Sequence, residues 1–225
     1  MMSPFSFSAR TLSLFLLFLS LPVSLSAATS DPEQTIERVQ KRYDATHSLK
    51  ADFIQKSYLK VMGQSQVAQG QVLIKKPGRM KWNYTAPDPQ LLISDEENLW
   101  LYLPEDKQAT RMKIESVYSS NTPALFLAGK GRLTQSFNVS QVLDVGDFFK
   151  ITLYPKENDQ DVDHLILFVD KKNYQILGSS VYDKLGNHTE MQFTNIQLNP
   201  PLNDGVFQFQ APAGVEVIDF SNPQH

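Results

Sequence analysis

The sequence predicts a mainly β protein, built on an antiparallel sheet of about ten or eleven strands. Short runs of aromatic and branched residues recur about every nine or ten residues between Gln71 and Leu103, and Pro, Gly and Asp separate them. In the second half, Gly146-Asp147 and Gly186-Asn187 stand between further apolar runs, which is typical of tight hairpin turns. No helical periodicity lies between these runs, so parallel crossover connections are not expected.

Residues 1–28 are expected to be a cleaved signal peptide. Arg10 is their only charge, Leu12–Leu21 is apolar, and Ser26-Ala27-Ala28 offers small residues for cleavage. The alternative is an uncleaved anchor, although the apolar stretch is short for a membrane span. No cysteine follows it, so lipid modification there is not expected. Residues 29–225 show no linker and no repeat, which predicts a single domain.

A helix is expected to begin after Asp31. Asp31 can cap it, Pro32 suits its first position, and Gln34 can complete a capping box. The spacing of Ile36, Val39 and Tyr43 then predicts one apolar face that covers the sheet. Tyr43 is interpreted as a core residue, with a binding role as the alternative.

Two neighbouring strands carry the most informative patterns. Residues 80, 82 and 84 are apolar or aromatic and alternate with Arg79, Lys81 and Asn83, so one face of that strand is apolar. The strand Leu99–Leu103 has leucines on one face, and Trp100 and Tyr102 on the other. A strand that is apolar on both faces must be covered on both sides. The sheet therefore has either two packed layers, or a core on one side and an apolar cavity on the other.

The remaining elements follow from the same alternation of apolar runs and turn residues. The strands are expected at Ser48–Tyr58, Val72–Ile74, Met80–Tyr84, Leu91–Ile93, Leu99–Leu103, Val139–Val145, Phe148–Tyr154, His164–Val169, Tyr174–Tyr182, His188–Leu198 and Val206–Phe209, and Gln108–Ile114 has a weaker strand pattern. The polar stretch Gly63–Gly70 is expected to be a hairpin connection.

A short second helix is predicted at Pro123–Ala128, after Asn121-Thr122 and before Gly129. It is apolar all round, whereas a surface helix has a polar face. The residues alone leave two interpretations open. The helix is either a buried plug at the end of a barrel, or a lid whose inner face meets an apolar ligand.

Composition excludes several classes of function. The chain has 21 basic and 24 acidic residues without a basic stripe, which argues against nucleic-acid binding. It has no cysteine, so neither disulfides nor thiolate chemistry are available. The histidines at 47, 164, 188 and 225 form no metal-binding or catalytic motif, and Asp159–Asp163 lacks the glycine of a calcium loop. No catalytic residue, metal or cofactor is therefore expected.

The chain resembles the LolA family of periplasmic carriers of outer-membrane lipoproteins. The resemblance rests on the segments Ile74–Tyr84, Pro87, Leu91–Asp95, Leu99–Tyr102, Asn121-Thr122-Pro123 and Phe207–Val215, in this order and spacing. It implies an open, incomplete β-barrel with helices over its mouth, whose apolar cavity takes up acyl chains. The helix at 123–128 would then be a short apolar lid.

The resemblance also implies a site and partners. The acyl-chain cavity would be lined by Met80, Trp82, Tyr84, Leu91, Ile93, Trp100, Tyr102, Leu125 and Phe126. Lys76, which stands where the family often has arginine, would latch the lid. The partners would be acylated lipoproteins, an inner-membrane ABC transporter that releases them, and an outer-membrane receptor, and the carrier would be a periplasmic monomer. The alternatives are a carrier of another amphiphile, such as a glycolipid, and a barrel-based sensor of envelope stress.

Overall fold

The computed structural model of the 225-residue chain describes residues 31–114, 132–157, 159 and 161–221. The predicted signal peptide and the predicted helix at 123–128 lie outside these residues. Among the described residues, no helix has both the length and the apolar character needed to cross a membrane.

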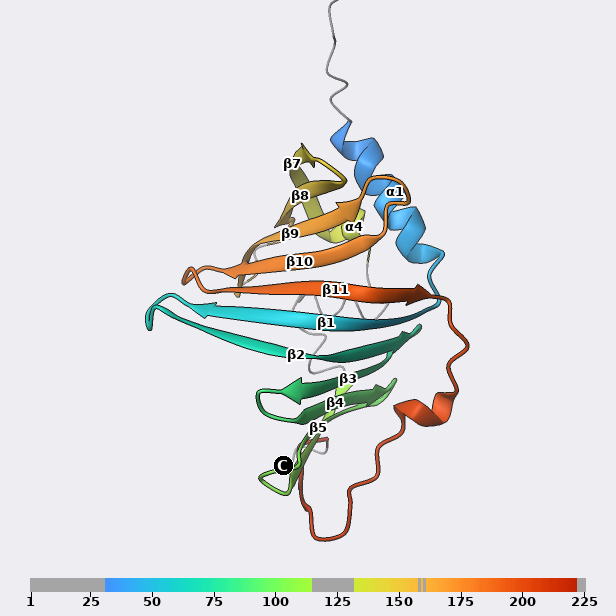
Figure 1. Ribbon diagram of the computed structural model, residues 1–225, viewed down its shortest axis with the longest axis vertical. Coiled ribbons are helices and arrows are strands. Elements are labelled where there is room, and N and C mark those ends of the chain that lie inside the picture. Colours follow the sequence, from blue (N-terminus) through green and yellow to red (C-terminus); the bar gives the residue numbers. More distant parts are fainter. Residues whose placement is uncertain (1–30, 115–131, 158, 160, 222–225) are drawn as a thin grey trace, which may run out of the picture.

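The described residues form one sheet of twelve strands, in the order β12-β6-β5-β4-β3-β2-β1-β11-β10-β9-β8-β7. Figure 1 shows the run from β5 through β1 and β11 to β7. The first and last strands of this order do not pair, so the sheet is open, as expected from the resemblance. The strands are β1 (Ser48–Leu59), β2 (Gln64–Lys75), β3 (Arg79–Ala86), β4 (Gln90–Asp95), β5 (Asn98–Leu103), β6 (Gln108–Lys113), β7 (Phe137–Val145), β8 (Phe148–Pro155), β9 (Val162–Asp170), β10 (Ile176–Asp183), β11 (His188–Leu198) and β12 (Glu216–Asp219).

The N-terminal helix α1 (Pro32–Asp44) begins where the sequence predicts. Asp31 Oδ1 accepts a hydrogen bond from the Glu33 backbone N at 3.0 Å. Gln34 does not complete a capping box; its Oε1 instead accepts from Arg38 at 3.3 Å. Ile36 and Val39 are buried, which confirms the predicted apolar face.

Three sequence-based expectations about the strands were wrong. Gly63–Gly70 is not a loop, because β2 begins at Gln64 and pairs with β1 along its whole length. Val206–Phe209, expected as the last strand, is not a strand: its first two residues end the short 3-10 helix η1 (Asp204–Phe207), and the last strand is β12. β12 pairs parallel with β6, which the expectation of a purely antiparallel sheet did not include.

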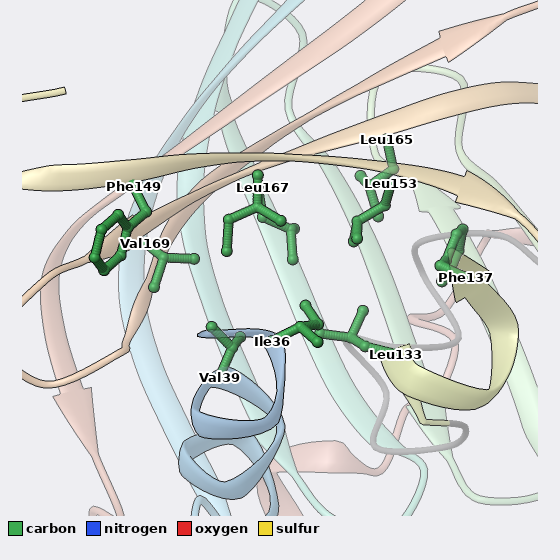
Figure 2. Packing of buried hydrophobic residues seen from close by; sticks show 10 residues of the cluster. Ile36, Val39, Leu133, Phe137, Phe149, Leu153, Leu165, Leu167 and Val169 are labelled. Carbon is green, nitrogen blue, oxygen red and sulfur yellow. The ribbon is translucent and has the colours of Figure 1, made fainter. Parts of the chain in front are cut away.

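The sheet has one face, here called the inner face, that carries α1. Cross-strand pairing places Phe53, Phe193, Met191 and Leu167 on this face. Phe53 of β1 pairs with Phe193 of β11, and Met191 lies two residues before Phe193, so it shares that face. Ser179 of β10 pairs with both Met191 and Leu167, so Leu167 of β9 lies on the same face as well. Figure 2 shows Ile36 and Val39 of α1 pointing toward Leu167 and its neighbours, together with Leu133 of the short helix α4 (Leu133–Ser136).

Two buried clusters cover the inner face. The helix-covered cluster consists of Ile36, Val39, Leu133, Phe137, Phe149, Ile151, Leu153, Leu165, Leu167 and Val169. The central cluster consists of Ala51, Phe53, Val72, Ile74, Met80, Trp82, Leu99 and Phe193. The first packs against α1 and α4, whereas the second comes from strands β1, β2, β3, β5 and β11.

Glycines mark two register shifts in the sheet. The pairing of β2 with β3 shifts at Gln69/Gly70, and the pairing of β10 with β9 shifts between Ile176 and Gly178. A Cβ atom on Gly70 would lie 2.1 Å from the Asn83 carbonyl oxygen, and one on Gly178 would lie 2.5 Å from the Met191 carbonyl oxygen. The neighbouring backbone therefore approaches closely only because these residues have no side chain.

Gly70→Ala should destabilise the fold strongly, because the added methyl group meets a backbone atom that cannot move without displacing β3. We expect a loss of about 2–3 kcal/mol in the free energy of unfolding, at the upper end of overpacking effects. Urea denaturation followed by circular dichroism measures it. Gln69→Ala, at the exposed neighbouring residue, is the control and should cost little. Equal urea midpoints for the two variants would contradict the close approach of the Asn83 carbonyl to Gly70.

Candidate lipid-binding face and its latch

The structure does not bring the predicted cavity residues together on one face. Met80, Trp82 and Tyr84 pair with Ser94, Leu92 and Gln90, on the inner face. Ile93 pairs with Lys81 and Trp100, and Leu91 pairs with Asn83 and Tyr102, on the opposite, outer face. The nine residues therefore divide into an inner set (Met80, Trp82, Tyr84), an outer set (Leu91, Ile93, Trp100, Tyr102), and Leu125 and Phe126, which lie outside the described residues.

Aromatic contacts join three strands on the inner face. Phe53 meets Trp82 edge to face at a centroid distance of 5.1 Å and meets Tyr84 at 4.9 Å. Phe193 of β11 lies 6.3 Å from Trp82. The Tyr84 hydroxyl donates to Gln55 Oε1 at 2.9 Å, and burial raises the pKa of this hydroxyl. Tyr84 thus marks the point where the apolar inner face becomes polar.

The outer face of β4 and β5 is covered by the C-terminal segment. Phe209 lies 5.2 Å from Trp100 and 5.4 Å from Tyr102, measured between ring centroids. Ile93 is 1% exposed, and η1 lies against β3 and β4. The outer set of predicted residues therefore packs against the chain's own end.

Ion pairs fasten this cover to the sheet. Asp204 of η1 pairs with Lys75 at 2.5 Å, and it lies 3.7 Å from Arg79. Arg79 also pairs with Glu96 at 2.5 Å. Glu96, in the turn between β4 and β5, has a φ of 86°, a value that residues other than glycine rarely adopt. Since these charges are partly exposed, their role is to position the segment rather than to supply much stability.

Several inner-face residues were not predicted as part of the site. Leu92 and Leu101 pair directly with each other, and Leu92 packs beside Trp82 in the central cluster. Phe53 and Phe193 belong to the same cluster from strands β1 and β11. The alternation of Leu99, Leu101 and Leu103 was visible in the sequence. To decide which of the two apolar faces of β5 lies inside, one must know how β5 pairs with β4 and how β4 pairs with β3, and the sequence alone does not give this pairing.

A small apolar cavity lies between the end of α1 and the inner face; we call it the α1 cavity. Its walls come from α1, from the start of β1, from the ends of β2 and β11, and from the turn between β9 and β10. Its lining residues are Val39, Arg42, Tyr43, Thr46, His47, Ser48, Leu49, Ile74, Lys76, Tyr174, Gln175, Ile176, Phe193 and Leu198. Its volume is about 60 Å³, far below the roughly 300–1,000 Å³ of sites that enclose a small molecule. An acyl chain therefore cannot enter it without a movement of its walls.

Lys76 holds α1 against the sheet beside this cavity. Its Nζ donates to the Tyr43 carbonyl oxygen at 2.5 Å and lies 3.2 Å from the centroid of the Tyr43 ring. The Tyr43 carbonyl lies in the last turn of α1, where a cation is favoured, and it also accepts a hydrogen bond from the Thr46 backbone N at 3.1 Å. The predicted acceptor, the helix at 123–128, lies outside the described residues. Burial lowers the pKa of Lys76 to about 8, and the Asp44 carboxylate opposes this shift only in part.

Histidine side chains meet on the outer face without forming a metal site. Tyr182 is stacked between His164 and His188, at centroid distances of 4.3 and 5.0 Å. Within the described ranges, no group of three His, Cys, Asp or Glu residues is placed to hold a metal ion.

Comparisons with known proteins agree with this architecture. The family model described as "Outer membrane lipoprotein carrier protein LolA" matches residues 44–210. An outer-membrane lipoprotein carrier protein of Azotobacter vinelandii is 30% identical over 204 residues, which cover 90% of this chain and 96% of that protein. The corresponding protein of Methylobacillus flagellatus is 27% identical, with 91% and 98% covered. A solved structure of an uncharacterised protein from Thermus thermophilus shares the fold, with a TM-score of 0.54 at 10% identity over 83% of this chain and 98% of that one.

The lowered pKa of Lys76 predicts a pH-dependent contribution to stability. Between about pH 8 and the ordinary lysine value of 10.5, the unfolded lysine binds more protons than the folded one. The contribution of Lys76 to the free energy of unfolding should therefore rise with pH through this window. Urea titrations of wild type and Lys76→Met at roughly pH 7 and pH 10 measure it. In the difference between their free energies of unfolding, the contributions of the other titrating groups cancel. A difference that is independent of pH would show that this amine is not desolvated.

Proposed function

Because the chain belongs to the LolA family of outer-membrane lipoprotein carriers, we propose that it carries lipoproteins with their acyl chains held on the inner face of the sheet. The observation that supports this most is the central cluster. It is a continuous layer of buried apolar residues from five strands, which includes Met80, Trp82 and Phe53. The outer face offers no such surface near β5, because Phe209 occupies it.

The energetics of an acyl chain require a surface of this kind. Burying each methylene group contributes about 0.8 kcal/mol, so a chain of about 16 carbons represents on the order of 10 kcal/mol. An aqueous compartment cannot be crossed with such chains exposed. A carrier must also release them, and large planar or flexible side chains bind a chain without polar contacts that would fix it in place.

Loading requires that the inner face be uncovered. In this structure α1 lies on that face, and the cavity under its last turn is too small for a chain. We infer that the C-terminal end of α1 moves away from the sheet when the acyl chains enter. The Lys76–Tyr43 contact then opposes opening by about 0.3–1 kcal/mol, the usual range for a cation at a helix C-terminus.

The route of the lipoprotein is part of the proposal. The carrier would receive it from an inner-membrane ABC transporter and pass it to an outer-membrane receptor, in the periplasm and as a monomer. The sequence contains no nucleotide-binding motif, so the work of loading would be done by the transporter. Reclosure of α1 would help to expel the chains at the receptor.

A carrier of another amphiphile is the second candidate, because an apolar surface does not select a headgroup. A stress sensor on the same sheet is a third. Mass spectrometry of ligands that copurify from the periplasm distinguishes them. Diacylated or triacylated lipoproteins support the proposal, whereas a glycolipid in their place would overturn it.

A charge on the inner face should prevent loading. Leu92→Glu places a carboxylate beside Trp82, where burial against acyl chains would be costly. Leu92 is partly exposed, so we expect the variant to fold and to lose most lipoprotein binding in a transfer assay. Leu73→Glu, the same change at a partly exposed residue on the outer face of β2, should load normally. Normal loading of Leu92→Glu would assign the chains to a different surface.

Removing the latch should favour the loaded state. Lys76→Leu deletes the contact with Tyr43 and adds apolar surface, so onward transfer to the receptor should slow by up to about fivefold, corresponding to roughly 1 kcal/mol. Arg79 is unsuitable as a control, because it pairs with Glu96 and Asp204. Lys81→Leu, on the outer face of β3, serves instead. Equal transfer rates for wild type, Lys76→Leu and Lys81→Leu would show that Lys76 does not act as a latch.

A further inference from the structure

The α1 cavity contains a buried hydrogen-bond donor for which the described residues provide no acceptor. Arg42 lines the cavity from the last turn of α1, and its Nε is buried without a hydrogen-bond partner. Buried donors in proteins are almost always paired, so each exception requires an explanation. No ion pair joins the Arg42 side chain to a carboxylate within the part of the chain that the structure describes.

The surroundings of Arg42 combine apolar walls with positive charge. Val39, Leu49, Ile74, Phe193 and Leu198 supply apolar wall, and Lys76 is the second cation at the rim. No Asp or Glu is among the described lining residues. Asp44, the carboxylate that acts on Lys76, is exposed and accepts from Gln40 Nε2 at 2.8 Å. The described walls of the cavity therefore supply no anion for Arg42 or Lys76.

We propose that the α1 cavity receives the anionic head of a single-chain lipid, with Arg42 and Lys76 as its partners and the chain lying along the central cluster. The shared chemistry is an acyl chain that ends in anionic oxygens, either the carboxylate of a free fatty acid or the phosphate of a lysophospholipid. This inference rests on the proposed function, since it uses the same inner face. It adds a head-group preference that a purely apolar surface would not have.

The chemistry of the two cations supports this ligand. A guanidinium presents N–H donors in a planar fork that matches the paired oxygens of a carboxylate or phosphate. An incoming oxygen would satisfy Nε of Arg42 and would compete with the Tyr43 carbonyl for Lys76 Nζ. Head-group binding would therefore loosen the contact that holds α1. Burial, which lowers the pKa of Lys76, also makes a neighbouring anion more favourable there.

Displacement of a neutral fluorescent dye from the purified protein tests this with four probes that share a 16-carbon chain. They are palmitate, palmitoyl lysophosphatidic acid, methyl palmitate and hexadecyltrimethylammonium, each below its micellar concentration. We expect at least one anion to bind about tenfold more tightly than the methyl ester, which corresponds to about 1.4 kcal/mol, and the ammonium to bind most weakly. The two anions distinguish the carboxylate source from the phosphate source.

Arg42→Met removes the fork while retaining an apolar side chain, and it should abolish the preference for the anion but leave methyl palmitate binding unchanged. Lys41→Met, at the exposed neighbour on α1, is the control and should retain the preference. If Arg42→Met fails to fold, Arg42→Lys, which keeps the charge without the fork, should show a reduced preference.

The outcomes separate the two proposals. Equal binding of anions and methyl ester by wild type overturns the head-group site but leaves an apolar carrier surface. An anion preference that survives in Arg42→Met also overturns it, because Arg42 is then not the partner. If none of the four probes binds, both this inference and the proposed acyl-chain surface are wrong.

Discussion

A strand that is apolar on both faces is the constraint on which the rest of this structure depends. Leu99 and Leu101 of β5 face inward, while Trp100 faces outward and cannot be left in water. The C-terminal segment covers the outer face through Phe209, and ion pairs of Asp204 fasten that segment to β2 and β3. With the outer side closed by the chain's own end, the inner side is the surface left for a ligand.

The inner face has two parts: one is packed under α1 as core, and the other meets only the end of α1. Around β8 and β9, Ile36 and Val39 complete a packed core with residues of both strands (Figure 2). Toward β1–β5, the central cluster is built by the sheet itself, and the end of α1 meets it at a small cavity with Lys76 at the rim. This arrangement suits a carrier, because one end of α1 can stay packed while the other end opens.

Much of the fold could be predicted from local patterns, but the faces of the sheet could not. Apolar runs and Gly-Asp or Gly-Asn turns located nearly all strands, and Asp31-Pro32 located α1. The polar sequence of Gln64–Gly70 concealed the first half of β2, because exposed strand ends need no apolar residues. Trp100 and Met80 were both predicted to line the cavity, although they lie on opposite faces of the sheet. The face of a residue on a doubly apolar strand depends on long-range strand pairing and on the C-terminal cover, which local patterns do not reveal. Lys76 was predicted to latch the helix at 123–128. Among the described residues, its Nζ donates to the carbonyl oxygen of Tyr43 in α1.

Photocrosslinking from two adjacent residues of β5 tests whether the acyl chains lie on the inner face of the sheet. Leu101 pairs with Leu92 on the inner face, and Tyr102 pairs with Leu91 on the outer face. A photoreactive phenylalanine analogue is placed at one position or the other in a carrier loaded with lipoprotein that has radiolabelled acyl chains. We expect a labelled product from position 101 and little or none from position 102. Labelling from position 102, with none from position 101, would contradict the assignment of the acyl chains to the inner face.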